Sequence, residues 1–395
     1  MAPAFAAALP LADWRPSRAP LAARHPSLAR LPWVCAAAPS SDGGKRVLII
    51  NAPSGGHSVI GPHLAEALLA AGHQVHVHQV GTPAADTQPF DRYPPLAAAH
   101  PAAFSLSHGA AAEALTAAGQ CSSGGAATAL PPLDAVYDNA SKAVADAAPA
   151  LAAAAAGAEI FFVSSAGAYA YDGTRAPHVA GDPAAGPTID VEAALRDAGA
   201  TGAVFRPIYI LGPGFQNRQY SDWLFDRIRD GRQIPIPGVP DALTCLTDVR
   251  DVAGLLASAL GKGLAGEIVN ATSPRGVTLR GVVALAAAAA GADPVAVADR
   301  VVWYDPAVAA AAMEGYVAKK AFPFRPRHFF ADPVPASPAV ADTLGWQAVH
   351  SGDATGLAAM FADAYDSYVA LGLDQRVVDY AMDDAILAVV GGGRS

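Results

Sequence analysis

The feature that most limits the fold of this chain is a short apolar run that ends in glycines and is followed by a helical pattern. Residues 45–51 have the profile of a fully buried parallel strand. The glycine-rich segment 55–61 comes next, and leucines at helical spacing follow it as far as Gly72. Strand, glycine turn and helix in this order predict the first unit of a parallel α/β sheet.

Strands and helices continue to alternate after this unit, which favours a parallel sheet with helices on its faces. We expect strands at 74–80, 133–137, 159–163 and 203–205, and helices at 141–156, 190–198, 249–260 and 355–371. The stretch 97–130 is rich in Ala, Ser and Gly without periodicity, and we expect it to be mostly loop. The fold class is therefore α/β, a Rossmann-like doubly wound parallel sheet with a smaller C-terminal lobe.

The N-terminal segment differs in composition from the rest of the chain. Residues 1–38 contain four arginines and a single acid, Asp13. This composition is typical of a plastid transit peptide, although a disordered tail is the alternative. The sequence then predicts a nucleotide-binding domain over 45–211 and a smaller lobe over 212–390 that is interleaved with the sheet.

The charge of the chain limits how it can bind nucleic acid. The formal net charge is −9 at pH 7, which argues against a broad basic surface, so any RNA contact must be local. No run approaches the roughly 20 strongly hydrophobic residues of a membrane helix, and no membrane span is expected. The three cysteines are too few for a disulfide framework or a zinc site.

The glycine loop predicts a phosphate site with two departures from the usual pattern. Glycines let the backbone approach a pyrophosphate, while the following helix directs its free N–H groups at the anion. Ser58 stands at the middle position, and Val80-Gly81 replaces the acid that would bind ribose hydroxyls. The loop is expected to hold a nucleotide or an RNA phosphate, or to be a tight turn kept for packing, and NAD(P) is left open. The candidate cofactor-binding residues are Gly55, Gly56, His57, Ser58 and Gly61.

Five motifs in order along the chain resemble those of the chloroplast stem-loop-binding proteins. These motifs are Asn51–Gly61, Ser164–Tyr169, Phe205–Gly212, Thr247–Val252 and Lys319–Arg325. The Asn-x-x-Ser-Gly-Gly-His loop is similar to the a-form of that pair. The resemblance covers about 45–390 and explains the stretch 97–130 least well.

The resemblance implies a fold, a compartment and partners. The fold would be of the atypical extended short-chain dehydrogenase/reductase type, in the chloroplast stroma. The partners would be RNA stem-loops, ribosomal RNA and the plastid ribosome, with a homologous b-form in a homo- or hetero-oligomer. The activity would be endonucleolytic cleavage assisted by a divalent metal such as magnesium, in support of RNA processing, ribosome function and plastid transcription.

The chemistry of hydride transfer is missing from the helix that should carry it. Reductases of this superfamily use a Tyr as proton donor, a Lys four residues later and a Ser that holds the substrate oxygen. Ser164 or Ser165 could supply the last group, but Thr188 and Glu192 stand where the Tyr and Lys belong. Two other pairs have the same four-residue interval but the wrong location, Tyr171 with Arg175 and Tyr316 with Lys320.

A basic and aromatic segment is the first candidate for RNA binding, because cations pair with phosphates and aromatic rings stack on unpaired bases. Its candidate residues are Lys319, Lys320, Phe322, Phe324, Arg325 and Arg327. The alternative is that the phenylalanines belong to the core of the second lobe. A second candidate is a helix with Arg218, Arg227, Arg229 and Arg232, for which packing against the core is favoured.

RNA cleavage would need a base and a group that stabilises the charge of the phosphorane, and a metal held by carboxylates could assist. The weak catalytic candidates are Asp138, Asp248, Asp251 and His57, with His178 as a further base, and the sequence identifies no metal ligands. Asp138 and Asp251 have a simpler interpretation as helix caps. Two other functions stay open: an NAD(P)-dependent nucleotide-sugar epimerase or reductase, and a non-catalytic ribosome-associated protein.

Overall fold

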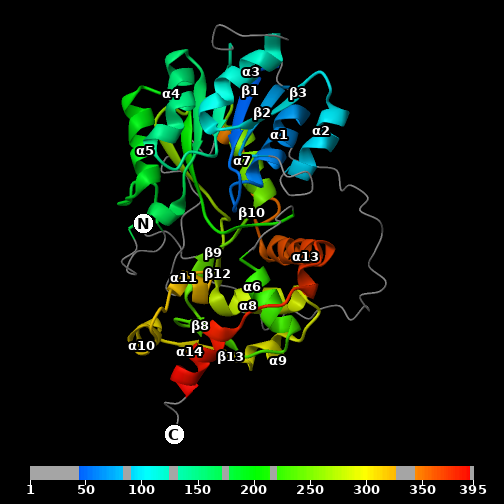
Figure 1. Cartoon of the computed structure of the whole chain (residues 1–395), viewed down its shortest axis with the longest axis vertical. Helices are drawn as coiled ribbons and strands as arrows, with labels where there is room; N and C mark the ends of the chain where they lie inside the picture. Colours follow the sequence, from blue (N-terminus) through cyan, green and yellow to red (C-terminus); the bar gives the residue numbers. More distant parts are fainter. Residues whose placement is uncertain are drawn as a thin grey trace.

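The computed structural model describes residues 44–82, 90–123, 132–170, 178–213, 220–325 and 343–391. Two lobes lie along the long axis of the molecule: a larger lobe built on a sheet and a smaller one that carries the C-terminal helix (Figure 1). Within these ranges, no helix has both the length and the apolar character needed to span a bilayer. The predicted transit peptide, residues 1–38, lies outside the described residues.

A seven-stranded sheet forms the centre of the larger lobe, with the strand order β11-β6-β5-β4-β1-β2-β3. All neighbouring strands in it are parallel. Its strands are β1 (Arg46–Asn51), β2 (Gln74–Val80), β3 (Phe104–Gly109), β4 (Ala135–Asp138), β5 (Glu159–Val163), β6 (Ala203–Pro207) and β11 (Glu267–Ala271). The predicted Rossmann-like parallel sheet is confirmed.

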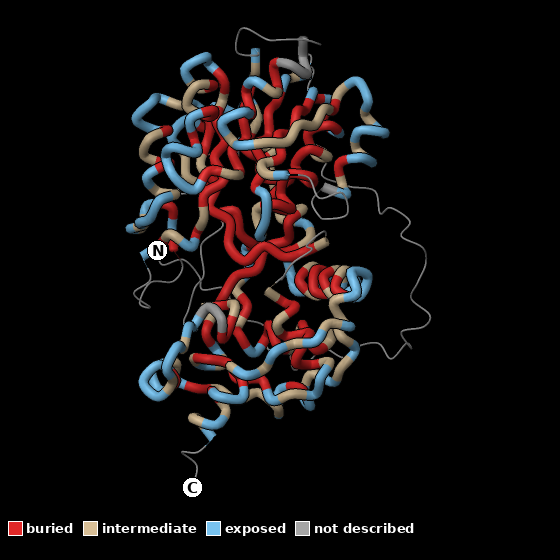
Figure 2. The backbone as a smooth tube through the Cα atoms, viewed as in Figure 1, coloured by how far each residue is buried: buried red, intermediate tan, exposed pale blue. Residues whose placement is uncertain are grey.

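Helices cover both faces of this sheet, because alternate residues of each strand point to opposite sides. Val47 and Ile49 of β1 belong to one core, and Leu48 and Ile50 belong to the other. The first core is covered by α1 (Ile60–Ala70), α2 (Tyr93–Ala99) and α7 (Val249–Ser258), and the second by α3 (Ala114–Ser123), α4 (Ala148–Ala155) and α5 (Pro187–Asp197). Figure 2 shows the buried strands beneath this shell of partly exposed helices.

The smaller lobe has its own apolar core, which includes Phe225, Met360 and Phe361. The helices outside the sheet layers are α6 (Asp222–Arg229), α8 (Leu279–Ala289), α9 (Pro294–Ala298), α10 (Pro306–Ala312), α11 (Ala318–Ala321), α13 (Ala354–Ala370) and α14 (Ala381–Gly391). The short strands are β7 (Ile210–Leu211), β8 (Ile234–Pro237), β9 (Leu243–Cys245), β10 (Thr247–Asp248), β12 (Gly276–Thr278) and β13 (Val301–Tyr304), and the 3-10 helices are η3 (Phe90–Arg92), η4 (Ala111–Glu113), η5 (Val144–Ala147), η6 (Ala166–Ala168) and η7 (Leu373–Gln375). Because β11 follows most of these strands in sequence yet returns to the large sheet, the two lobes are interleaved.

The expectation that 97–130 is mostly loop was wrong for its described part, which contains β3 and α3. The strand β3 pairs with β2 along its length, and Ser105 and Ser107 face His76 and His78. The serine hydroxyls bond the imidazoles at 2.8–2.9 Å. A strand held by polar contacts has no run of apolar residues, so hydrophobic periodicity did not reveal it.

Candidate functional site

The glycine loop between β1 and α1 is a tight turn closed by its own backbone. Gly55 has a φ of +78°, where a side chain would be strained. The Ser58 backbone N–H donates to Gly55 O at 3.0 Å, and the Ser58 hydroxyl donates to the same oxygen at 2.8 Å. The Ser58 side chain is therefore turned toward the loop itself, and it is buried.

Gly61 is needed because a buried asparagine lies beneath it. A Cβ atom at Gly61 would come within 2.3 Å of Asn51 Cγ. Asn51 Nδ2 donates to Ser58 O at 2.8 Å, and Asn51 Oδ1 accepts a hydrogen bond from Asn139 Nδ2 at 2.7 Å. Asn139 Nδ2 also donates to His57 O at 2.7 Å. Two buried amides thus hold two carbonyls of the loop from below.

The end of β2 carries a neutral side chain that points inward. Gln79 is fully buried, and its Nε2 donates to Ala52 O at 2.8 Å. Its Oε1 accepts hydrogen bonds from Asn51 Nδ2 at 2.8 Å and from the hydroxyl of Tyr93 at 3.0 Å. The sequence predicts only Val80-Gly81 at this strand end. Gln79 and Tyr93 were not predicted, because nothing in the local pattern links the two residues.

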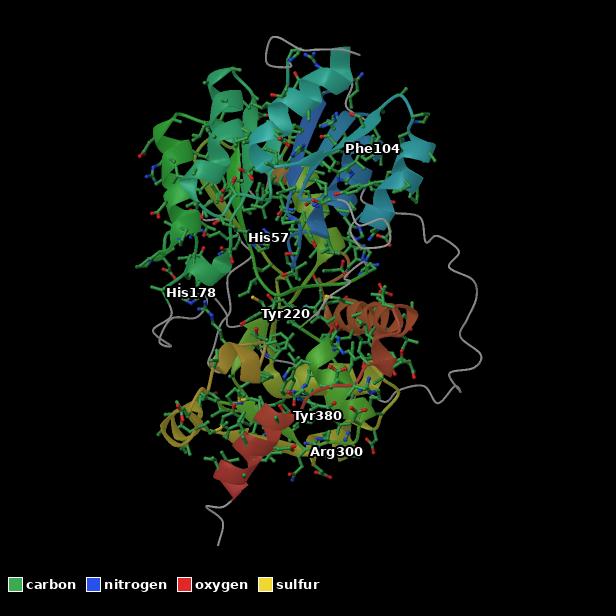
Figure 3. The ribbon with its side chains drawn as sticks, in the orientation of Figure 1. His57, Phe104, His178, Tyr220, Arg300 and Tyr380 are labelled. Carbon is green, nitrogen blue, oxygen red and sulfur yellow. The ribbon has the colours of Figure 1, made fainter. Side chains whose placement is uncertain are left out.

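His57 lies on the loop at the side of the larger lobe that faces the smaller lobe (Figure 3). It is half-buried, and its Nδ1 lies 3.5 Å from Nζ of the exposed Lys142. Burial, with the charge of Lys142, lowers the pKa of His57 to about 3. The imidazole is therefore neutral and a weak base near pH 7, which weighs against its predicted catalytic role.

Asp138 and Asp248, two of the candidate catalytic acids, hold backbone at strand ends. Asp138 Oδ1 accepts from the N–H groups of Ala140 and Ser141, and Oδ2 accepts from the Ser141 hydroxyl at 2.6 Å. Asp248 is the N-cap of α7 and pairs with the Arg250 guanidinium at 2.7 Å. Burial raises the pKa of both carboxyls.

Asp251 was predicted to cap a helix, and this was wrong, because Asp248 takes that position. The two oxygens of Asp251 accept hydrogen bonds from the backbone N–H groups of residues 349–351 and from the Ser351 hydroxyl at 2.7 Å. Among the described residues there is no group of three or more His, Cys, Asp or Glu side chains that could hold a metal ion. None of the three acids is arranged to share a metal with the others there.

The helix α5 confirms that an acid occupies the position of the proton-relay lysine. Glu192 is buried, and its Oε1 accepts from the Ser164 hydroxyl at 2.5 Å. Arg206 Nη2 and Nε donate to the two oxygens of Glu192 at 2.6 and 3.0 Å. Thr188, four residues earlier, has no phenol to donate a proton. The usual reductase site is filled here by a buried ion pair.

Further polar and aromatic side chains surround this ion pair, and they were not predicted. The Tyr169 hydroxyl donates to Asn270 Oδ1 at 2.6 Å, and the Arg206 guanidinium lies 4.8 Å from the Tyr169 ring centre. The His178 ring stacks on the Tyr169 ring with the two centres 5.1 Å apart, and His178 Nδ1 lies 3.3 Å from Asp182 Oδ2. His178 is thus packed on the tyrosine beside the ion pair, away from the glycine loop that carries His57.

The other Tyr pairs do not restore the reductase site. Tyr171 and Arg175 lie outside the described residues. The hydroxyl of Tyr316 lies 3.2 Å from that of Tyr304, and both rings belong to a cluster of the smaller lobe. Tyr316 is therefore remote from Ser164 and α5.

The basic and aromatic segment is partly core. Phe322 and Phe324 are each 3% exposed and pack in the smaller lobe, so the prediction that they stack on RNA bases was wrong and the core alternative is correct. Arg325 is half-buried: its N–H donates to the Tyr209 hydroxyl and its Nη2 donates to Gly167 O, both at 2.8 Å. The backbone of Lys319 and Lys320 lies in α11, and Arg327 lies outside the described residues.

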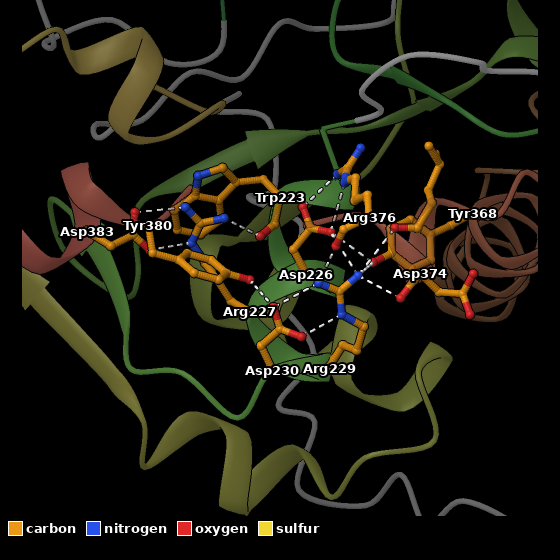
Figure 4. A network of polar contacts seen from close by, with 11 residues as sticks. Trp223, Asp226, Arg227, Arg229, Asp230, Tyr368, Asp374, Arg376, Tyr380 and Asp383 are labelled. Atoms are coloured by element: carbon orange, nitrogen blue, oxygen red, sulfur yellow. Dashed lines mark hydrogen bonds and ion pairs between the residues drawn. The ribbon is translucent and has the colours of Figure 1, made fainter. Parts of the chain in front are cut away.

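The arginines of α6 hold the C-terminal segment in place (Figure 4). Arg227 is buried, and its Nε and Nη2 donate to the Asp383 carboxylate at 2.7 and 2.8 Å. The Arg227 guanidinium also lies 3.5 Å from the Trp223 ring centre. The ion pair fixes α14 to α6 and leaves the Arg227 charge neutralised.

The neighbouring arginines also hold parts of the chain together. Arg229 pairs with Asp230 at 2.6 Å and donates to backbone carbonyls of residues 373–376, while Arg232 pairs with Asp384. Arg218 lies outside the described residues. As favoured from the sequence, this helix packs against the protein, and its described arginines are not a free basic surface.

Comparison with known proteins agrees with this architecture. The chain is similar to solved NAD-containing structures of a dTDP-glucose 4,6-dehydratase from Bacillus anthracis (12% identity, TM-score 0.60, 83% of this chain and 97% of that one) and of a UDP-glucuronic acid 4-epimerase from Bacillus cereus (13% identity, TM-score 0.58, 82% and 99%). The chain has the extended short-chain dehydrogenase/reductase fold. At these identities the likeness extends to the fold alone.

A relative of known name tests the predicted resemblance to chloroplast stem-loop-binding proteins. The chain is 31% identical over 262 residues to the chloroplast stem-loop binding protein of 41 kDa b from Arabidopsis thaliana. The match covers 65% of this chain and 64% of the relative, which is just under two thirds of its length. The resemblance to chloroplast stem-loop-binding proteins is thus confirmed, and the assignment to the a-form stays a prediction. No family model matches the chain.

The reductase fold implies a nicotinamide dinucleotide, but the residues present do not fit one. The end of β2 offers Gln79, uncharged and hydrogen-bonded inside the protein, in place of a carboxylate for the ribose. Glu192, at the helix position of the proton-relay lysine, is paired with Arg206. No step of the function proposed below therefore involves such a cofactor.

Proposed function

We propose that this chain binds RNA stem-loops and does not transfer hydride. The name of the Arabidopsis relative supports the first half of this proposal, since that protein is described as binding stem-loops in the chloroplast. RNA stem-loops expose unpaired bases and a dense row of phosphates, which a protein can grip at a local site despite an acidic overall charge.

The observation that carries the second half is the buried pair of Glu192 and Arg206. A reductase needs a phenol that donates a proton and an amine that lowers the pKa of this phenol. Thr188 and Glu192 supply neither, and the carboxylate is already bonded to Arg206 and Ser164. An epimerase or reductase of nucleotide sugars is therefore disfavoured.

Two cations near the carboxyl ends of the strands, Lys142 and Arg325, form the proposed RNA contact together with the basic segment beside Arg325. Lys142 is exposed beside the glycine loop, and Arg325 contacts the turn that follows β5. The segment that contains Lys319, Lys320 and Arg327 adjoins Arg325 in sequence.

The finer parts of the function come from the resemblance. The proposal includes import into the chloroplast stroma, association with ribosomal RNA and the plastid ribosome, and a role in RNA processing and transcription. It also includes cleavage of the bound stem-loop with magnesium. Among the described residues, Asp138, Asp248 and Asp251 all have structural hydrogen bonds, so a metal for cleavage would need other ligands.

The test is binding of the full chain to a labelled stem-loop RNA across a range of salt concentrations. We expect the triple variant Lys142→Ala/Lys319→Ala/Lys320→Ala to bind at least tenfold more weakly and with a smaller salt dependence, by roughly one unit of logarithmic slope for each phosphate that is no longer bound. The matched control removes three exposed cations elsewhere, Arg196→Ala/Lys262→Ala/Arg280→Ala. Equal decreases in affinity for both variants would overturn the proposed contact.

Two further arms separate the other functions. Cleavage of the RNA in magnesium but not with chelator would add the endoribonuclease activity, whereas intact RNA would leave binding alone. Turnover of a nucleotide sugar by the same preparation would establish the reductase alternative. Absence of RNA binding together with association with ribosomes would favour a ribosome-associated protein that contacts other proteins.

A further inference from the structure

We propose that the chain fills its own dinucleotide site, so that internal side chains replace the cofactor that this fold holds in other proteins. The network consists of Asn51, Gln79, Tyr93 and Asn139. This inference does not depend on RNA binding, because it concerns only what occupies the space beneath and beside the glycine loop.

A dinucleotide requires two kinds of group at the ends of β1 and β2. The glycine loop must present backbone N–H groups to the pyrophosphate, and an acid near the end of β2 must accept hydrogen bonds from the ribose hydroxyls. The first requirement is met in part by Gly55 and Gly56. The second is not, because Gln79 takes the strand position directly opposite Asn51.

Gln79 has no hydrogen-bonding capacity left for a ribose. Its Nε2 donates to Ala52 O at 2.8 Å and is within 3.3–3.4 Å of the carbonyls of Asn51 and Val80. Its Oε1 accepts from both Asn51 Nδ2 and the Tyr93 hydroxyl. With two donors and two acceptor sites in the amide, these hydrogen bonds satisfy it within the protein.

Tyr93 supplies the hydroxyl that a ribose would otherwise bring. It follows the 3-10 helix η3 and is fully buried. Its ring stacks on the Phe104 ring, with the two ring centres 6.1 Å apart. Its oxygen donates to Gln79 Oε1 at 3.0 Å and accepts from Asn51 Nδ2 at 3.1 Å. The chain itself therefore places a hydroxyl at the end of β2, and this hydroxyl donates one hydrogen bond and accepts another.

The same network holds the loop in its folded form without a ligand. Asn51 Nδ2 binds Ser58 O, and Asn139 Nδ2 binds His57 O. In a cofactor enzyme the N–H groups of such a loop and of the following helix bind the pyrophosphate. Here two buried amides bind two carbonyls of the loop, and the glycine at 61 serves to admit the Asn51 side chain.

The first test is titration of the full chain with NADH and with NADPH, followed by nicotinamide fluorescence and by calorimetry. We expect no saturable binding up to about 1 mM, which corresponds to a free energy weaker than about −4 kcal/mol. Micromolar binding of either nucleotide, or its presence in the purified protein, would overturn the inference. RNA affinity is measured on the same sample, so that failure of the proposed function is recorded separately.

A second test asks why position 61 must be glycine, and it does not depend on detecting a ligand. Gly61→Ala should lower the melting temperature by several degrees in the native background, because its Cβ would overlap Asn51 Cγ. In an Asn51→Ala background the same substitution should have little further effect, since the overlapping atoms are gone. Gly55→Ala, where no atom lies within 4 Å of the added Cβ, serves as the control and should give the same decrease in both backgrounds.

Additive decreases from Gly61→Ala and Asn51→Ala would contradict the inference. They would mean that Gly61 is required for a contact other than the Asn51 side chain.

Discussion

At the carboxyl ends of β1 and β2 the buried polar groups are neutral, whereas at the ends of β5 and β6 they are a carboxylate and a guanidinium. The first set is the amide network of Asn51, Gln79 and Tyr93, and the second is Glu192 with Arg206. The first set lies beneath the glycine loop, and the second lies at the helix position where a reductase carries its relay lysine. They differ in what the removal of one member leaves behind.

Removal of one member from the neutral network leaves an unsatisfied hydrogen-bonding group. Removal of one member from the ion pair leaves an isolated buried charge, which costs far more. A return to reductase chemistry would need lysine at 192, and this lysine would face Arg206 with a like charge. We therefore expect single substitutions to destabilise the ion pair at the ends of β5 and β6 most. The neutral network at the ends of β1 and β2 should tolerate them better.

The largest expected effect tests the ion pair. Glu192→Ala should lower the free energy of unfolding by about 3–5 kcal/mol, because Arg206 would remain buried without its partner. Urea unfolding followed by circular dichroism measures this change. The control on the same helix is Asp197→Ala, at an exposed position where a change within about 0.5 kcal/mol is expected. A decrease below roughly 1 kcal/mol for Glu192→Ala would mean that Arg206 finds another partner, and the contrast between the two edges would disappear.

The sequence was enough to place Thr188 and Glu192 on the helix after β5 but not to identify the groups that surround Glu192. The positions 188 and 192 follow from the order of strands and from helical spacing, so their identities could be judged directly. The partners of Glu192 lie on neighbouring strands, as Ser164 and Arg206 do. Ser164 and Arg206 come close to Glu192 because β5 and β6 are neighbours in the sheet, and the sequence pattern alone does not give the strand order of the sheet.

Charge was the least reliable guide from sequence, because the partner of a basic residue can come from far along the chain. Arg227 pairs with Asp383, 156 residues later. The same limitation applies to Phe322 and Phe324, whose burial depends on Tyr209, Tyr220 and Trp223 from another part of the lobe. A basic and aromatic composition therefore predicted an RNA surface where the fold uses several of these residues for its own core.

An intermediate effect tests the neutral edge. Tyr93→Phe should lower the free energy of unfolding by about 1–2 kcal/mol, because the buried Gln79 Oε1 loses the hydroxyl that donates to it. The matched control is Tyr365→Phe in the smaller lobe, a half-buried tyrosine for which a change within about 0.5 kcal/mol is expected. A decrease from Tyr93→Phe as large as that from Glu192→Ala would show that the neutral network is no more tolerant than the ion pair.

The smallest effect concerns the opposite face of β2, where neutral histidines take the place of amides. His78 Nε2 lies 2.9 Å from the Ala110 carbonyl and must donate to it, so His78 Nδ1 accepts from the Ser107 hydroxyl. His76 Nε2 then donates to Ser107 Oγ, and His76 Nδ1 accepts from the hydroxyl of Ser105. This chain of hydrogen bonds is complete when both imidazoles are neutral.

Burial, with the neighbouring His78, lowers the pKa of His76 from 6.5 to about 4. As the pH falls below 6.5 the unfolded chain binds a proton that the folded chain does not, so this contribution reduces stability progressively until the folded pKa is reached. At about pH 5.5 the free energy of unfolding should be roughly 1 kcal/mol lower than at about pH 8 through His76 alone. Unfolding curves of the native chain and of His76→Gln at both pH values isolate this contribution, because the other buried histidines are common to both.

An equal pH dependence in the two proteins would mean that protonated His76 is accommodated by Ser105 and Ser107. Ser107 Oγ already accepts from His76 Nε2, and the Ser105 hydroxyl can turn to accept from a protonated Nδ1, so this outcome would show that the β3-facing side of β2 tolerates a charge.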